Sequence, residues 1–343
     1  MCTQNARYRN AVTGIPVRIL LALICLSTAA VACNIPVFRY ALERWTPDNC
    51  QIYVFHDGPL TDNDRRVVAE LESVAGGERR LANVRLHQHD VRQQLPADIQ
   101  DVWFDARPLA ENHKGQAVYV ARSVVGQGKT ITVWQGTSEE LNRTGVLRSP
   151  VRSELAQRLQ AGHAVVWLML KSTDDTRNEA TRKMLNSQFE RLATSIELPE
   201  GIGLPGSELY SEVPLLLKFS VLEIDPSDPK ESFLVKLLTG FHPDAVADGE
   251  PLIAPVFGRG RALEVIPASK LNPDLIEDLT VFLCGACSCQ VKELNPGFDL
   301  LLSSDWNTAL FGEGTSGPPA RIEGSQRADV PVTIPIPTGK KRR

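Results

Sequence analysis

Short strand-like runs and longer helix-like segments follow one another in the same order twice along this chain. The runs are rich in β-branched residues, whereas the longer segments repeat their apolar residues with helical periodicity. The first succession predicts strands at 51–56, 83–89, 117–121 and 130–134, and helices at 61–74, 97–102 and 150–160. The second predicts strands at 164–171, 215–224, 252–257 and 262–267, and helices at 174–195, 230–238 and 273–282. Each succession has the order β-α-β-α-β-β-α, which restricts the chain to an α/β fold of two tandem units.

This order of elements resembles the thioredoxin fold over residues 51–283. The stretch Pro255–Gly258 is similar to the one in which a cis-proline opens the third strand of that fold. The resemblance implies a first thioredoxin-like domain at 33–162 and a second, which carries a cysteine cluster, at 163–311. The segment 312–343 is rich in Gly, Pro, Ser and charge, so a disordered tail is predicted there.

The first 32 residues have the pattern of an export signal. Three arginines precede an apolar run at 19–32, and the small residues Ala30 and Ala32 stand at the positions that a signal peptidase requires. The run is shorter than the roughly 20 residues needed to span a bilayer. We therefore predict a signal peptide at 1–32 and an extracytoplasmic protein, in the periplasm or on a membrane surface.

Cys33 leaves two outcomes of export open. The residues Ala30–Cys33 resemble a bacterial lipobox, in which the cysteine carries lipid and becomes the first mature residue, although Ala30 replaces the usual leucine. The same residues also form an Ala-x-Ala cleavage site for soluble export. Lipid at Cys33 would make a membrane surface the partner of this protein.

Charge excludes one class of partner. Removal of Arg7, Arg9 and Arg18 with the leader reduces the 37 basic residues to 34 against 41 acidic ones, a net charge of −7. Nucleic-acid binding requires a basic surface, so no nucleic-acid partner is expected.

Four stretches together are similar to a family of exported proteins from planctomycete-type bacteria: Ala32–Trp45, Ser149–Leu159, Pro255–Leu263 and Cys284–Gly297. The family has no assigned activity that the resemblance could transfer. The resemblance therefore implies export and a common architecture, and it supplies no catalytic residue.

Export makes disulfides the leading expectation for the remaining cysteines, Cys50, Cys284, Cys287 and Cys289. The spacing of Cys284 and Cys287 resembles the thioredoxin active site, but that motif belongs between the first strand and first helix of a unit. At those positions the chain has His56–Pro59 and Lys171–Asp174, without cysteine. Redox chemistry therefore remains an alternative to structural disulfides.

A thiophilic metal is a second alternative, because Cys284, Cys287 and Cys289 place three sulfurs within six residues. A fourth ligand would have to come from Cys50 or a histidine. His87 and His89 share one face of a strand, where a solvated polar face is preferred to a ligand pair.

Two other groups of charged residues are candidates for less specific sites. The arginines of Gly258–Arg261 are expected in an exposed turn, with a small anion site as the alternative. Asp299 and Asp305 near the cysteine cluster are candidate ligands or acids.

The sequence therefore predicts an exported, non-enzymatic binding or assembly module that uses no cofactor. The alternative is an extracytoplasmic thiol-redox or thiophilic-metal-handling protein that works through the cysteine cluster.

Overall fold

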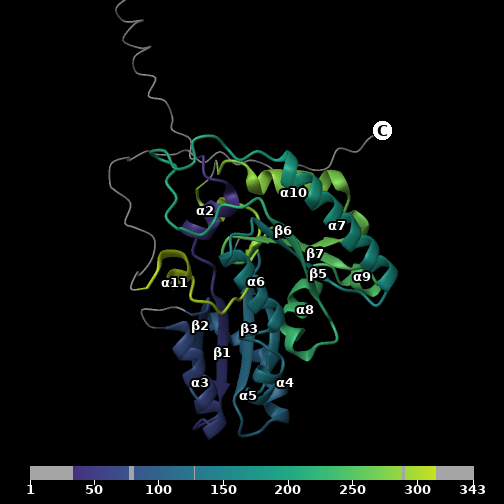
Figure 1. The fold of residues 1–343 in the computed structure, drawn as a ribbon. Helices are drawn as coiled ribbons and strands as arrows, with labels where there is room; N and C mark the ends of the chain where they lie inside the picture. Colours follow the sequence, from purple (N-terminus) through teal and green to yellow (C-terminus); the bar gives the residue numbers. More distant parts are fainter. Residues whose placement is uncertain (1–33, 77–80, 127, 288–289, 314–343) are drawn as a thin grey trace, which may run out of the picture.

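The computed structural model describes residues 34–76, 81–126, 128–287 and 290–313. Within them the chain forms a mixed α/β fold with one sheet of 4 strands, one of 6 strands and 10 helices (Figure 1). The α/β class is therefore as predicted. The predicted signal peptide at 1–32, Cys33, Cys289 and the predicted tail beyond Glu313 lie outside the described residues.

The first sheet has the strand order β2-β1-β3-β4. Strand β1 pairs in parallel with β2, and β3 is antiparallel to both β1 and β4. The strands are β1 (Cys50–His56), β2 (Val84–Asp90), β3 (Val118–Val124) and β4 (Thr130–Gly136). The accompanying helices are α3 (Asp62–Ala75), α4 (Ala97–Asn112), α5 (Ser138–Arg143) and α6 (Pro150–Gln160).

The second sheet repeats this arrangement and adds strands at the edge. Its main order is β10-β8-β7-β5-β6, with β9 paired to β7. The strands are β5 (Val165–Leu170), β6 (Phe219–Ile224), β7 (Leu252–Phe257), β8 (Arg261–Ala262), β9 (Ile266–Pro267) and β10 (Phe298–Asp299). The helices that follow in the chain are α7 (Asp175–Ser195), α8 (Ser232–Thr239), α9 (Pro243–Ala247), α10 (Pro273–Cys284) and α11 (Trp306–Phe311).

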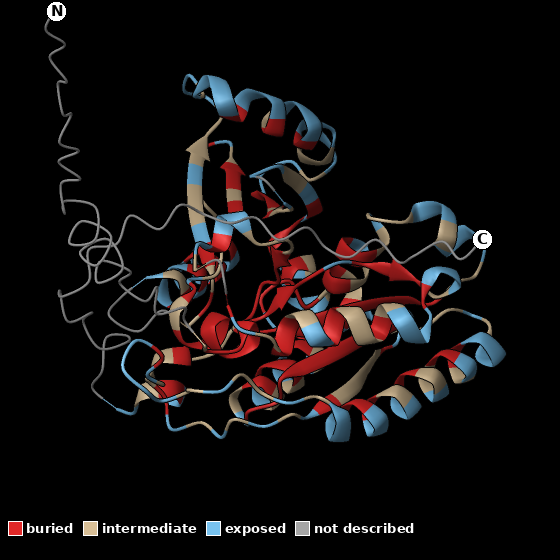
Figure 2. Ribbon diagram, turned by 90° about the horizontal axis from the view of Figure 1, so that it is seen from above, coloured by how far each residue is buried: buried red, intermediate tan, exposed pale blue. Residues whose placement is uncertain are grey.

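Alternating side chains place each sheet between two apolar layers. In the second sheet Val166 and Leu168 enter a central core with α6 and α8, whereas Trp167 and Met169 face α7 and α10. Ile52 of the first sheet enters the same central core. The other face of the first sheet packs against α4 through Phe55, Ile99 and Val102. Both sheets thus share one core, and Figure 2 shows the buried strands covered by helices with exposed outer faces.

Each end of the described chain packs against the sheet that the other half of the chain forms. Helix α2 (Val37–Arg44) comes first in the chain, but its Val37 and Phe38 pack in the outer core of the second sheet. Near the end of the chain, Ser303 pairs with Ala82 beside the first sheet, and Leu300 to Leu302 enter the central core. The ranges 33–162 and 163–311 therefore each contribute to the core of the other.

Several element boundaries differ from the prediction. In place of one strand at 262–267 the chain has two separate two-residue strands, β8 and β9, with the exposed Glu264 between them. The helix expected at 97–102 continues to Asn112, and residues 215–218 belong to a loop at 196–218. Pro255 follows a trans peptide bond in the middle of β7, so the expected cis-proline is absent there. The elements α5, α9, β10 and α11 were not predicted.

Candidate functional site

Cys284 is the last residue of α10, and Gly285 caps that helix. Cys284 and Cys287 are each only 1% exposed, in the outer core of the second sheet. Burial raises the pKa of the Cys284 thiol to about 12. A reactive thiol of the thioredoxin type sits at a helix N-terminus, where the dipole stabilises the thiolate, whereas Cys284 lies at the opposite end. The environment of Cys284 therefore keeps it protonated and unreactive.

The Cys-x-x-Cys segment is paired with the start of the described chain. The backbone N–H of Cys287 donates to the carbonyl oxygen of Ile35 over 2.9 Å, and Val37 N–H donates to Gly285 over 3.0 Å. Pro36 and Ala286 form an antiparallel bridge between these bonds. The pairing ties the segment to the residues that follow Cys33, and both cysteine side chains are buried although Ala286 between them is exposed.

Cys50 lies in β1 and belongs to the central core, away from the core that holds Cys284 and Cys287. Burial raises its pKa to about 12, against the opposing influence of a hydrogen bond with Ser123. No disulfide joins Cys50, Cys284 and Cys287 to one another. The structure therefore does not bring Cys50 to the cluster, either as a disulfide partner or as a fourth metal ligand.

No group of three or more cysteine, histidine or acidic side chains is arranged around a metal position within the described ranges. His87 and His89 lie on the α4 side of β2, where the Tyr53 ring stacks on His87 at 4.8 Å. They are half-buried rather than fully solvated, which corrects the expectation of a solvated face. Burial lowers the pKa of both imidazoles, so they stay neutral under ordinary conditions.

The positions that hold the active site in thioredoxin have structural contacts here. His56 at the end of β1 donates a hydrogen bond from Nδ1–H to the Gly58 carbonyl oxygen, at 2.7 Å. Lys171 after β5 pairs with Asp225 at 3.0 Å. Asp174 caps α7 by accepting from the N–H groups of Thr176 and Arg177. These positions carry no cysteine.

The arginines of the Gly258–Arg261 turn are not exposed, so the exposed turn was wrong. Arg259 donates to the carbonyl oxygens of Leu42 and Glu43 of α2, and burial lowers its pKa to about 10. Arg261 is 6% exposed and donates to three backbone carbonyls of residues 295–297. Internal acceptors thus occupy both guanidinium groups, which leaves little capacity for a bound anion.

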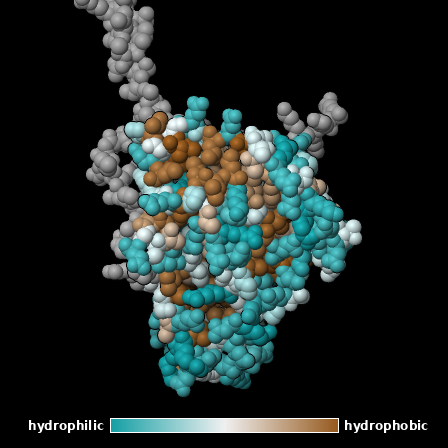
Figure 3. Space-filling model, in the orientation of Figure 1, coloured by the Kyte–Doolittle hydropathy of each residue, from teal (hydrophilic) through white to brown (hydrophobic). Residues whose placement is uncertain are grey.

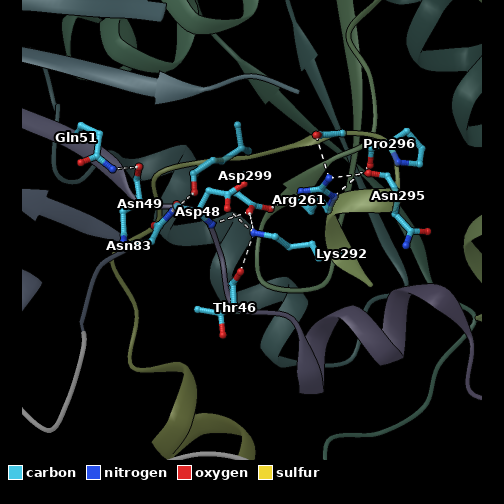
Figure 4. A network of polar contacts seen from close by, with 12 residues as sticks. Thr46, Asp48, Asn49, Gln51, Asn83, Arg261, Lys292, Asn295, Pro296 and Asp299 are labelled. Atoms are coloured by element: carbon cyan, nitrogen blue, oxygen red, sulfur yellow. Dashed lines mark hydrogen bonds and ion pairs between the residues drawn. The ribbon is translucent and has the colours of Figure 1, made fainter. Parts of the chain in front are cut away.

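Asp299 joins Arg261 in a buried network of charges (Figure 4). Its Oδ1 accepts from Arg261 at 3.2 Å, and its Oδ2 accepts from Lys292 at 2.9 Å and from the Asp48 N–H at 2.7 Å. Lys292 also donates to Asp48 Oδ1 at 2.6 Å and to the Thr46 carbonyl at 2.8 Å. All three ammonium protons and both Asp299 oxygens have partners.

This network clamps three parts of the chain that are distant in sequence. Lys292 and Asp48 are 244 residues apart, and Asn83 extends the network by donating to the carbonyls of Asp48 and Leu300. A carboxylate engaged in this way is a structural anchor and not a ligand or an acid. Asp299 was among the residues predicted from the sequence, whereas Lys292 and Asp48 were not. No sequence pattern indicates which charged residues form an ion pair over such a separation.

Asp305 lies elsewhere, at the start of α11, where it accepts from the Thr308 N–H at 3.0 Å. It lines a polar surface cavity of about 390 Å³ between α6 and the segment before α11, together with Gln157, Gln160 and Ser304. Gln160 donates to Ser304 Oγ across this cavity at 2.7 Å. The cavity has no pair of carboxylates and none of the predicted cysteines.

A scan against protein-family models, a search of curated proteins and a search of solved structures each found no match to this chain. The function is therefore inferred from the contacts that the residues of this chain make.

Proposed function

We propose that this protein is an exported, lipid-anchored module that binds or assembles with other molecules and catalyses no reaction. In this proposal two thioredoxin-like units without the redox motif form its body. The order of the four main strands supports such units. In space the strands are arranged as β2-β1-β3-β4 in the first sheet and as β6-β5-β7-β8 in the second, and corresponding neighbours pair in the same parallel or antiparallel sense.

The observation that supports the non-enzymatic part of the proposal is the burial of Cys284 and Cys287. Cys284 is buried at the C-terminal end of a helix with a raised pKa, and the segment 285–287 is paired with residues 35–37. Attack on a disulfide requires an accessible thiolate. Neither requirement is met at Cys284.

The proposed location on a membrane surface rests on the predicted signal peptide and on Cys33. No helix in the described part of the chain is long and apolar enough to cross a membrane. Metabolic labelling with a tagged fatty acid tests the anchor: we expect label on the full chain and none on Cys33→Ser. Equal labelling of the two chains, or label on neither, would overturn lipid attachment at Cys33.

A thiol assay tests the absence of redox chemistry. The native chain should fail to accelerate the reduction of insulin by dithiothreitol, and Cys50 and Cys284 should be alkylated only after unfolding. Metal analysis of the same preparation should find no stoichiometric thiophilic ion. Rapid alkylation of Cys284 in the native chain, or a bound ion lost in Cys284→Ser, would favour the thiol or metal function instead.

A further inference from the structure

Seven large apolar side chains are well exposed in the described part of the chain: Phe104, Leu204, Leu216, Val246, Val281, Val291 and Leu294. Their distribution is uneven. Leu204 and Leu216 belong to the loop 196–218, Val281 to α10, and Val291 and Leu294 to the segment after the cysteines. All three segments contact residues 34–45, through Ser207, Gly285 and Gln290. Exposed apolar side chains that gather on one surface indicate an interaction site.

The chain is fixed to the body from its first described residue. Asn34 N–H donates to Ser207 Oγ at 2.9 Å, and Ile35 is completely buried with its carbonyl bonded to Cys287. Since consecutive Cα atoms are about 3.8 Å apart, Cys33 has no linker that could hold the body away from a lipid attached to it. A lipid at Cys33 would therefore bring the body directly to the membrane.

Two of the exposed apolar side chains belong to segments that contact this starting point. A methyl group on Gly201 would lie 3.0 Å from the side-chain nitrogen Nδ2 of Asn34 and 3.7 Å from Cδ1 of Leu204, which is 62% exposed. Val281 lies one turn before Gly285, whose carbonyl oxygen accepts from the Val37 N–H. Figure 3 shows apolar side chains gathered at the end of the molecule where Figure 1 places α2 and α10.

The charge of the loop 196–218 indicates which kind of membrane suits this surface. Its exposed charged residues are four glutamates and a single lysine: Glu197, Glu200, Glu208, Glu212 and Lys218. Carboxylates repel anionic headgroups, so the contact must depend on apolar burial and not on attraction to acidic lipid. A zwitterionic phosphatidylcholine surface is compatible with both features.

We propose that the surface formed by Leu204 and Val281 beside Asn34 rests on the lipid bilayer to which Cys33 is attached. This inference rests on the lipid anchor proposed above and adds an orientation: α10 and the loop 196–218 face the membrane, and α3 and α4 of the first sheet point away from it (Figure 1). A bilayer is the partner that we infer for this surface, because the described chain begins beside it and no linker separates Cys33 from the body.

Photocrosslinking tests this orientation. The photoreactive residue p-benzoylphenylalanine is placed at position 204 or 281 of the full chain, and at position 104 of α4 as the control. Phe104 is 74% exposed and belongs to α4, which Figure 1 shows at the end of the molecule opposite α10, and all three changes spare the core. The lipidated chains are reconstituted in vesicles of tritiated phosphatidylcholine and separated by flotation.

We expect at least tenfold more tritium on chains labelled at 204 and 281 than at 104. Equal, low incorporation at all three positions in chains that float with vesicles would overturn the orientation while preserving the anchor. Failure to float would overturn both. Crosslinks to a second protein chain, or lipid crosslinks that appear only after truncation at Glu313, would overturn the proposal by showing that protein covers the surface.

Discussion

The guanidinium of Arg39 lies 2.8 Å from the carboxylate of Glu43, and both side chains are closed off from solvent, with exposures of 1% and 0%. The Glu43 carboxylate also accepts from Arg44 at 2.7 Å and from the N–H groups of Tyr210 and Ser211, and Arg39 donates to the Ser211 carbonyl. Burial lowers the pKa of Arg39, and the neighbouring Glu43 opposes this shift. The pair therefore fastens α2 to the loop 196–218.

Glu43→Gln should destabilise the fold by about 3 kcal/mol, because it leaves a buried guanidinium without its counter-charge. Urea unfolding followed by tryptophan fluorescence measures this change. Glu111→Gln removes a carboxylate from the exposed pair Arg107–Glu111 and serves as the matched control, with no resolvable effect expected. Equal midpoints for the two variants would contradict the structural role of the pair.

Asp299→Asn should cost about 2 to 4 kcal/mol of unfolding free energy, since Arg261 and Lys292 would share a neutral amide in a buried site. Asp62→Asn, at an exposed ion pair with Arg65, controls for the loss of a surface charge. The measurement is again the urea midpoint. Increased cleavage of the Asp299 variant near residues 292–300 by a protease would show that the clamp has opened; an unchanged digestion pattern would argue against it.

Gly258→Ala should release α2. Gly258 has φ +60°, and a Cβ there would stand 2.7 Å from Cβ of Ala41 and 3.2 Å from its carbonyl carbon. Gly115→Ala isolates the backbone strain, because Gly115 has φ +81° but open space around it. We expect Gly258→Ala to lower the stability by about 2 kcal/mol more than Gly115→Ala, the cost of overpacking. Similar losses would mean that α2 does not approach the turn closely.

Stability should fall as the pH falls from about 6.5 toward 4. Burial lowers the pKa of His163 from 6.5 to about 4, and Lys218 and Arg158 act in the same direction, against Glu154. The unfolded chain therefore binds a proton first, so unfolding free energy rises with pH through this window, by up to about 3 kcal/mol from His163 alone. His163→Gln should flatten the profile measured by urea titrations at several pH values. An equally steep profile in the variant would assign the dependence to other groups.

Local signals in the sequence predicted much of the fold. Ser149 and Pro150 place the start of α6 correctly, and the apolar run at 164–171 predicts the fully buried β5. Strand β10 escaped prediction because it has two residues and exists only through pairing with the distant strand β8. Short strands of this kind have no periodicity to detect.

The environment of the candidate site residues was less predictable than the fold, because it too depends on segments that are distant in sequence. Arg39 and Glu43 have the i,i+4 spacing of an ordinary solvent-exposed helix pair, and only the loop 196–218 makes them buried. Likewise, the spacing of Cys284 and Cys287 is visible in the sequence, but their burial depends on residues 35–37. The sequence identifies the residue types, whereas contacts between distant segments decide their chemistry.

The packing of each chain end against the other half of the chain bears on how an exported chain would acquire its structure. A polypeptide that passes through a secretion channel amino end first delivers α2 early, but the residues that bury Val37 and Phe38 arrive between 164 and 287. The segment 298–310 that completes the central core arrives later still. Contacts of such long sequence separation form slowly. If the chain is exported as proposed, it should therefore stay extended and competent for transport until nearly all of it has crossed, and fold as a unit on the far side.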